Sequence, residues 1–199
     1  MIKFILGKKL GMSQVFSEDG KVTPVTIVLA EPMRVTQLKT VEKDGYEAVQ
    51  LGSGKAKKLS KPMKGHLKEL GNLRDLIEWR GKVEMVIGET IDVTSFNVGD
   101  IVKVSGISKG KGFQGGVKRH GFRGMPASHG HKHVTRHVGS IGQRFPQHTL
   151  KGLRMAGRMG ADRISVRGLK VVNVDKDQNL LLIKGAVPGR KGTLLEIRG

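Results

Sequence analysis

The chain has 199 residues, 37% of them apolar, and carries a formal net charge of +19 with a sequence pI near 10.4. This length suggests one domain with an elaboration, or two small domains. The absence of cysteine excludes disulfides and thiol catalysis, and no apolar run approaches the length of a membrane-spanning helix, so a cytoplasmic nucleic-acid binder is the class expected.

The first hundred residues predict antiparallel β structure. Short apolar runs at residues 2–6 and 14–16 precede a turn at 18–20, which carries the Asp-Gly signal. A strand follows over residues 22–30, and Pro24 indicates that its start lies at a sheet edge or bulge. A further turn is expected at Asp44-Gly45 and another at 97–100. The other strands predicted in this part cover residues 34–40, 46–51, 73–79, 83–86, 91–96 and 101–105.

A short helix is expected near residues 62–70, after a basic loop of small residues at 53–61. Pro62 suits the first turn of a helix and Gly71 the position just past its end. Towards the end of the chain, strands over 163–174 and 180–184 form a hairpin around 176–179, and residues 193–198 form a terminal strand.

These elements predict a mainly β fold with little helix, an antiparallel barrel or sandwich. The expected division is a β-rich globular part at 1–107, a long extended basic loop at 108–160, and a β-hairpin with a terminal strand at 161–199 that completes the barrel.

No acidic residue lies between Asp100 and Asp162. Residues 101–161 hold 12 Lys and Arg and six of the seven histidines, whereas residues 1–100 have a net charge of only +3 and residues 162–199 of +4. Positive charge this dense is tolerable beside a polyanion. The stretch also contains 13 glycines and no apolar periodicity, so it predicts a functional loop that binds nucleic acid, with a flexible linker as the alternative.

Two motifs within this stretch could instead indicate a dinucleotide site or a metal site. Residues 110–115 match the G-x-G-x-x-G pattern, but no helical pattern follows and no acid lies about 20 residues further on, so a dinucleotide site is not favoured. The histidines between His129 and His137 have no neighbouring carboxylate or thiol, so phosphate and base-edge contact is favoured over a metal. No cofactor is expected. No carboxylate constellation for acid–base or two-metal chemistry is evident, so the chain is not expected to be an enzyme.

Five segments together resemble the bacterial form of the universal ribosomal protein L-three family across essentially the whole chain. They are LGKKLGM at 6–12, SKGKGFQG at 108–115, GSIGQ at 139–143, MAGRMG at 155–160 and KGAVPG at 184–189. The resemblance implies a translation-factor-type barrel on the large ribosomal subunit, next to other large-subunit proteins. It further implies direct rRNA binding that nucleates assembly, and a loop that runs toward the peptidyl-transferase centre. It also implies N5-methylation of Gln143 by a glutamine methyltransferase.

The residues expected to contact rRNA are basic or imidazole side chains of the loop. Since only eight aromatic residues are present in the whole chain, contact through phosphate and sugar is favoured over base stacking. The alternative function is a free barrel-type RNA-binding translation or assembly factor. The predicted contact residues are Lys109, Lys111, Lys118, Arg119, Arg123, His129, His131, Lys132, His133, Arg136, His137, Arg144, Lys151, Arg154 and Arg158.

Overall fold

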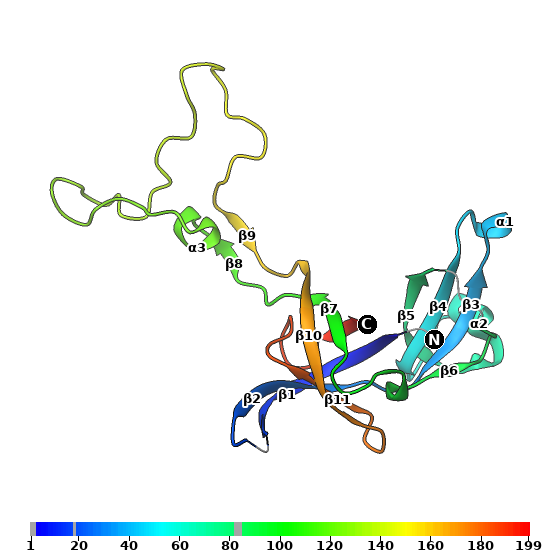
Figure 1. Ribbon diagram of the computed structural model, residues 1–199. Helices are drawn as coiled ribbons and strands as arrows, with labels where there is room; N and C mark the ends of the chain where they lie inside the picture. The colour runs from blue at the N-terminus through cyan, green and yellow to red at the C-terminus, as the bar shows by residue number, and fades with distance from the viewer. Residues whose placement is uncertain (1–2, 18, 82–84) are drawn as a thin grey trace. The chain divides into compact units, whose positions relative to one another are not determined.

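The computed structural model describes residues 3–17, 19–81 and 85–199 (Figure 1). The chain forms two compact units. One combines the chain up to Ile107 with Arg163–Gly199, and the other, called the inserted unit below, is Ser108–Asp162. Among the described residues, no helix has the length and apolar character needed to cross a membrane.

Six antiparallel strands close a barrel in the order β1-β12-β7-β10-β11-β2 (Figure 1). The last strand of the chain lies between β1 and β7, so the barrel closes only when both ends of the chain are in place. This closed barrel confirms the prediction of a mainly β, antiparallel fold. The barrel strands are β1 (Phe4–Phe16), β2 (Val22–Leu29), β7 (Ile101–Ile107), β10 (Arg163–Asp175), β11 (Leu180–Lys184) and β12 (Leu194–Arg198).

A second, four-stranded sheet has the order β5-β4-β3-β6. Its strands are β3 (Met33–Lys39), β4 (Ala48–Lys55), β5 (Leu73–Arg80) and β6 (Thr90–Ile91). The connection between β4 and β5 contains α2 (Lys61–Leu67) and the 3-10 helix η1 (Lys68–Leu70), where a helix near residues 62–70 was predicted. The remaining elements are α1 (Val41–Asp44), the 3-10 helix η2 (Val93–Ser95), β8 (Gly112–Gln114), α3 (Gly116–His120) and β9 (Gly157–Met159).

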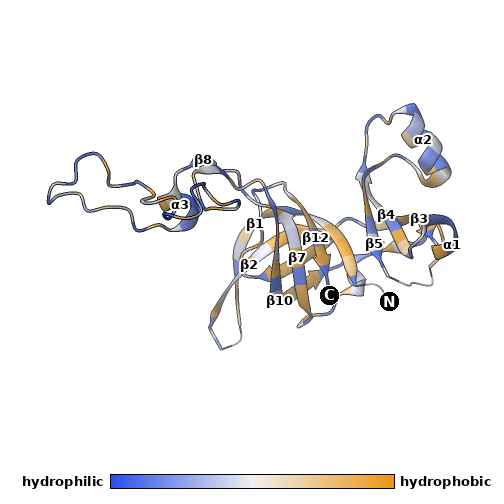
Figure 2. Cartoon of the chain, turned by 90° about the horizontal axis from the view of Figure 1, so that it is seen from above, coloured by the Kyte–Doolittle hydropathy of each residue, from blue (hydrophilic) through white to orange (hydrophobic). Residues whose placement is uncertain are grey.

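One continuous apolar core joins the barrel to the second sheet. In β12 the buried positions alternate, as the period of a strand requires, so that Leu195 and Ile197 are completely buried. At the start of β1, Phe4, Ile5 and Leu6 are buried in succession, a pattern typical of a strand covered on both faces. Figure 2 shows the apolar residues concentrated on the strands of both sheets.

Several predicted elements need correction. The apolar runs at 2–6 and 14–16 belong to one strand, β1, which continues past a bulge between Lys9 and Gly11; Ile2 lies outside the described residues. The turn predicted at 18–20 is present at Asp19-Gly20, and Glu18 lies outside the described residues. The Asp44-Gly45 turn is the end of the short helix α1.

The strand predicted over residues 91–96 is wrong beyond Ile91. The chain turns there into η2, because Val93 and Phe96, three residues apart, are both buried, which is the spacing of a 3-10 turn. Of the strand predicted over 83–86, residues 83 and 84 lie outside the described residues, and the next two are not in a strand. Pro24 lies at the end of the β2–β11 ladder rather than at a sheet edge: the last pair of that ladder is Val25 with Lys184, the Pro24 carbonyl accepts from the Gly185 amide, and Pro24 pairs with Gln14 of β1.

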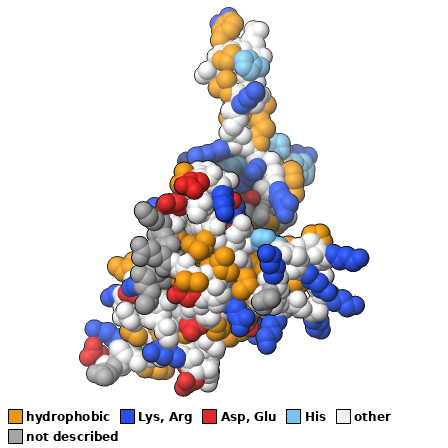
Figure 3. Space-filling model, turned by 90° about the vertical axis from the view of Figure 1, so that its right-hand side faces the viewer, with side chains coloured by type: hydrophobic (Ala, Val, Ile, Leu, Met, Phe, Trp, Pro, Cys, Tyr) orange, Lys and Arg blue, Asp and Glu red, His pale blue; other side chains and the backbone are white. Residues whose placement is uncertain are grey.

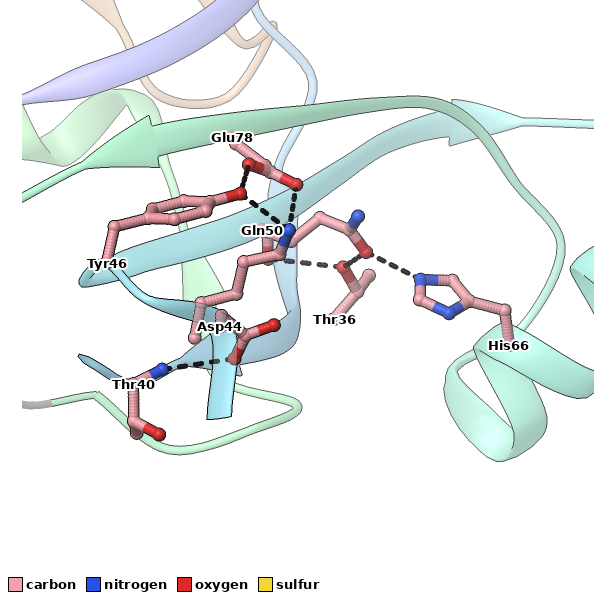
Figure 4. Close-up of polar contacts among 8 residues, drawn as sticks. Thr36, Thr40, Asp44, Tyr46, Gln50, His66 and Glu78 are labelled. Carbon is pink, nitrogen blue, oxygen red and sulfur yellow. Dashed lines mark hydrogen bonds and ion pairs between the residues drawn. The ribbon is translucent and has the colours of Figure 1, made fainter. Parts of the chain in front are cut away.

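A half-buried polar cluster links β3 and β5 of the second sheet through Tyr46 (Figure 4). The Lys39 ammonium lies 2.8 Å from a carboxylate oxygen of Glu78 and donates a hydrogen bond of 2.7 Å to the Tyr46 hydroxyl. Tyr46 in turn donates to Glu78 at 2.9 Å. The hydrogen bonds from Lys39 and Tyr46 lower the pKa of Glu78, and the hydrogen bonds from Lys39 to Glu78 and to Tyr46 raise the pKa of Lys39.

We expect Glu78→Gln to make the protein less sensitive to acid. Because the pKa of Glu78 is lowered by folding, its interactions stabilise the fold above the ordinary value of 4.5 and are lost as the pH falls through the lowered pKa. The unfolding free energies of the Glu78→Gln variant and of the unsubstituted protein should differ by no more than about 1 kcal/mol, because the Lys39–Glu78 pair is partly exposed. Urea unfolding at neutral and acidic pH measures it, and an identical pH dependence in both proteins would contradict this role.

Candidate nucleic-acid interface

The inserted unit leaves and rejoins the barrel at neighbouring residues. Ile107 at the end of β7 pairs with Arg163 at the start of β10. Beyond this pair, the Ser108 amide donates to the Asp162 carbonyl at 2.9 Å, and β8 pairs with β9. Gly160 has a φ of +75°, and a Cβ there would lie 2.1 Å from the Lys109 carbonyl oxygen, so only glycine fits. The outgoing and returning chain segments therefore run side by side at the base of the unit.

A short helix, α3, follows the base, and the expectation that no helix follows Gly115 is wrong. Phe122 and Val138 lie against Gly116, where an added Cβ would meet their side chains at 2.9 and 3.1 Å. This local packing stabilises a helix of five residues, which is too short to show an amphipathic period in the sequence.

Two side chains of α3 tie the helix to the returning segment. Arg119 Nη1 donates a hydrogen bond of 2.9 Å to the Met155 carbonyl oxygen, and His120 Nε2 lies 3.0 Å from the same oxygen. A Cβ on Gly157 would lie 2.5 Å from Arg119 Nη1, so a glycine makes room for the guanidinium. Arg119 is half-buried and is therefore held within the unit, which distinguishes it from the other predicted contact residues.

The other fourteen predicted contact residues are all exposed. Among the described residues, no carboxylate lies within ion-pair distance of any of them. Their charges are thus left for a partner. They are Lys109, Lys111, Lys118, Arg123, His129, His131, Lys132, His133, Arg136, His137, Arg144, Lys151, Arg154 and Arg158.

Apolar side chains are also exposed on the inserted unit, and sequence reasoning did not single them out. Phe113 is 77% exposed and Phe145 65%, and the guanidinium of Arg144 lies 5.8 Å from the centre of the Phe145 ring. Ile141 and Leu150 are exposed as well. Exposed aromatic rings beside cations suit contact with bases and sugars. The signal in the sequence was an aromatic residue placed between basic ones within an acid-free stretch.

The backbone of the distal part leaves hydrogen-bonding groups for a partner. Within the described part of the chain, residues 139–149 make no backbone-to-backbone hydrogen bond. The histidines of this unit do not converge with acids, since no group of three His, Asp or Glu suited to a metal occurs among the described residues. His131 and His137 instead line an open hollow together with Arg136.

The two neighbouring cations of α3 should respond differently to substitution. Lys118→Ala should reduce the salt slope of RNA binding, the slope of log affinity against log salt concentration, by about 0.7–0.9, because Lys118 is exposed and has no carboxylate partner among the described residues. Arg119→Ala should instead destabilise the closed base of the inserted unit by about 1 kcal/mol, because the hydrogen bond from Arg119 to the Met155 carbonyl is lost.

Filter binding at several salt concentrations measures the first effect, and the rate of trypsin cleavage after Arg158 in the free protein measures the second. Arg119→Lys keeps the charge and serves as the control for a purely electrostatic effect. Equal changes for Lys118→Ala and Arg119→Ala in both assays would contradict the separation of roles.

Comparison with known proteins agrees with this arrangement. A family model described as "Ribosomal protein L3" matches residues 52–180. The chain is 50% identical over 203 residues to large ribosomal subunit protein uL3 of Heliobacterium modesticaldum, covering 98% of this chain and 96% of the relative. It is 47% identical over 206 residues to the protein of the same name from Herpetosiphon aurantiacus, covering 99% of this chain and 96% of the relative.

These similarities span the barrel, the second sheet and the inserted unit. A third relative of that name, from Corynebacterium jeikeium, is 49% identical over 204 residues, which cover 99% of this chain and 94% of the relative. The relatives are named as ribosomal proteins, which agrees with the expectation of a non-enzymatic protein of cytoplasmic ribosomes. Identity of this size over nearly the whole length shows that the chain belongs to the ribosomal protein L3 family.

Proposed function

We propose that this protein, as a structural constituent of the large ribosomal subunit, binds large-subunit rRNA directly and makes most of the contact through residues 108–160. In this division, residues 1–107 and 161–199 form the body that docks on folded RNA. The observation that carries the proposal is the set of fourteen exposed basic and imidazole side chains on one acid-free segment, none of which has a carboxylate partner in the described part of the chain. Neighbouring large-subunit proteins are the other partners.

Electrostatic attraction would supply most of the free energy of RNA binding. Ten Lys and Arg side chains of the inserted unit are exposed and without a carboxylate partner among the described residues. Each of them that neutralises a phosphate releases counterions, so about six such contacts would give a salt slope near −5. The folding of this unit by itself leaves the mutual repulsion of these charges uncompensated, and a polyanion removes that cost.

We further propose that the distal part of the unit passes between RNA segments toward the peptidyl-transferase centre, and that early binding of this kind nucleates assembly. Support comes from the base, where β8 and β9 run side by side, and from residues 139–149, which make no backbone-to-backbone hydrogen bond in the described structure; the Gly142 amide and carbonyl bond only to the Ser140 hydroxyl. Backbone groups without protein partners need water or RNA to satisfy their hydrogen bonds. Fully extended, a loop with about 27 residues each way would reach roughly 90 Å.

Gln143 is a proposed substrate of a glutamine methyltransferase. Its side chain is exposed in a segment that also lines a small hollow with Ser140 and Leu153, so its amide is open to an enzyme. Mass spectrometry of the tryptic peptide 137–144 from native ribosomes tests the proposal. Replacement of one amide hydrogen of Gln143 by a methyl group should raise the mass of the peptide by one CH2 unit, and a wholly unmodified peptide would contradict the proposal.

Cosedimentation separates a ribosomal constituent from a free RNA-binding factor. The protein is expected to remain with large subunits through a high-salt wash, and ultraviolet crosslinks to rRNA are expected mainly within residues 108–160. Complete release in the wash would favour the free factor. Crosslinks confined to the barrel strands would contradict the role given to the inserted unit.

A further inference from the structure

A second acid-free run lies outside the inserted unit. Residues 48–68 contain no Asp or Glu. We infer that six lysines of this run form a second binding surface for the phosphate backbone of RNA, next to α2 on the second sheet. The inference rests on the proposed function only in taking the same rRNA as ligand. This α2 lysine surface consists of Lys55, Lys57, Lys58, Lys61, Lys64 and Lys68.

The surface is built on an ordered connection. β4 and β5 pair as far as Lys55 and Leu73, and the Ala56 amide donates to the Asn72 carbonyl at 2.9 Å, which closes the connection at its base. Leu67 of α2 is only 1% exposed, so the helix is anchored by the burial of this side chain. Because the segment is ordered before binding, less conformational entropy is lost when it meets RNA.

A series of hydrogen bonds between side chains also links α2 to the sheet (Figure 4). His66 Nε2 lies 2.7 Å from Gln50 Oε1, and the Thr36 hydroxyl donates to that same oxygen at 2.8 Å. A carbonyl oxygen only accepts, so His66 donates through Nε2. This contact fixes the rotation of α2 about its axis. Lys61 and Lys64, three residues apart on the helix, remain exposed on one side of it.

The charges of this surface are uncompensated. Among the described residues, none of the six lysines has a carboxylate within ion-pair distance, whereas Lys3 and Lys39 elsewhere in the same unit are paired. Lys55 also lines a groove with Lys8 and Arg34, and Glu31 is the one acid among its described lining residues. Figure 3 shows Lys and Arg side chains gathered along the right-hand edge of the face it presents.

RNA fits this surface better than a lipid membrane does. All six lysine side chains are exposed, whereas the apolar residues of α2, Met63 and Leu67, are half-buried and buried. Insertion into a membrane interface needs exposed apolar side chains beside the cations. No aromatic residue lies within residues 48–68, so the contact would be with phosphate rather than with stacked bases.

The test compares two triple variants of the full-length protein for binding to a transcript of the large-subunit rRNA. In the first, Lys57, Lys61 and Lys64 are changed to Gln. In the control, Lys21, Lys43 and Lys176 are changed to Gln; these are equally exposed, but each lies within two residues of an acid in the sequence. The salt slope should fall by about two in the first variant and stay unchanged in the control.

An unchanged slope in the α2 variant, while Lys118→Ala still lowers it, would overturn this inference and leave the proposed function intact. An equal fall in both triple variants would also overturn it, because net charge alone would explain the result. No salt-dependent binding by the unsubstituted protein would overturn the proposed function itself. Circular dichroism and thermal melting verify folding, and the double variant Lys57→Gln and Lys58→Gln, confined to the loop before α2, replaces the triple variant if α2 is lost.

Discussion

Replacing Ser108–Asp162 by a two-residue Asn-Gly turn is expected to give a folded protein that binds large-subunit rRNA at least about a hundredfold more weakly at physiological salt. The replacement removes ten exposed Lys and Arg side chains that have no carboxylate partner among the described residues. Counterion release is roughly additive over phosphate contacts, so the salt slope should also become much shallower.

The barrel should survive this replacement because of where the inserted unit begins and ends. Ile107 and Arg163 are directly paired in the β7–β10 ladder, so a two-residue hairpin turn can join them. Thermal melting of the shortened and full-length proteins tests folding, and filter binding tests affinity. Undiminished affinity in a shortened protein that melts normally would show that the body, not the inserted unit, supplies the binding energy.

Ile197→Ala is expected to destabilise the body by about 3 kcal/mol, within the range of 2–5 kcal/mol usual for such changes. The Ile197 side chain is completely buried, and β12 joins β1 to β7, with Ile197 opposite Ile5 on one side and Val104 on the other. Its truncation leaves a cavity at the strand that closes the barrel, and close-packed neighbours refill such a cavity only in part. Urea unfolding measures the change.

Ile101→Ala is the matched control, because it makes the same chemical change on a barrel strand where the side chain is 68% exposed. It should alter the unfolding free energy by no more than about 0.5 kcal/mol. A similar loss for both substitutions would mean that β12 packs loosely and that barrel closure does not depend on it.

The sequence predicted most of the barrel because its strands are apolar runs separated by clear turn signals, and β11 and β12 also show the alternating burial of a strand. The prediction failed where a short apolar run forms a 3-10 turn instead of a strand. Val93 and Phe96 are apolar enough to suggest a strand, yet they lie in and after a 3-10 turn that points both into the core. Helix α3 has five residues, and its packing partners Phe122 and Val138 lie outside it, so no local pattern indicates it.

The charge of the candidate interface was visible in the sequence, but the separate role of Arg119 was not. Its neighbour Lys118 has the same charge, and only the fold shows that Arg119 reaches the Met155 carbonyl, 36 residues further along the chain. Four lysines of the α2 lysine surface lie in the basic loop predicted at 53–61, although residues 53–55 belong to β4 and Lys61 begins α2. The ordering of the surface depends on Leu67 and on the contact of His66 with Gln50. Local sequence patterns do not predict contacts between segments that are distant in the chain.

Hydrogen–deuterium exchange of the full-length protein, alone and bound to large-subunit rRNA, tests most directly whether RNA binding orders the inserted unit. The amides of residues 139–149, which bond to no other backbone group in the described structure, should exchange rapidly in the free protein and slowly in the complex. Equal exchange of these amides in both states, with protection confined to the barrel and the second sheet, would contradict the account.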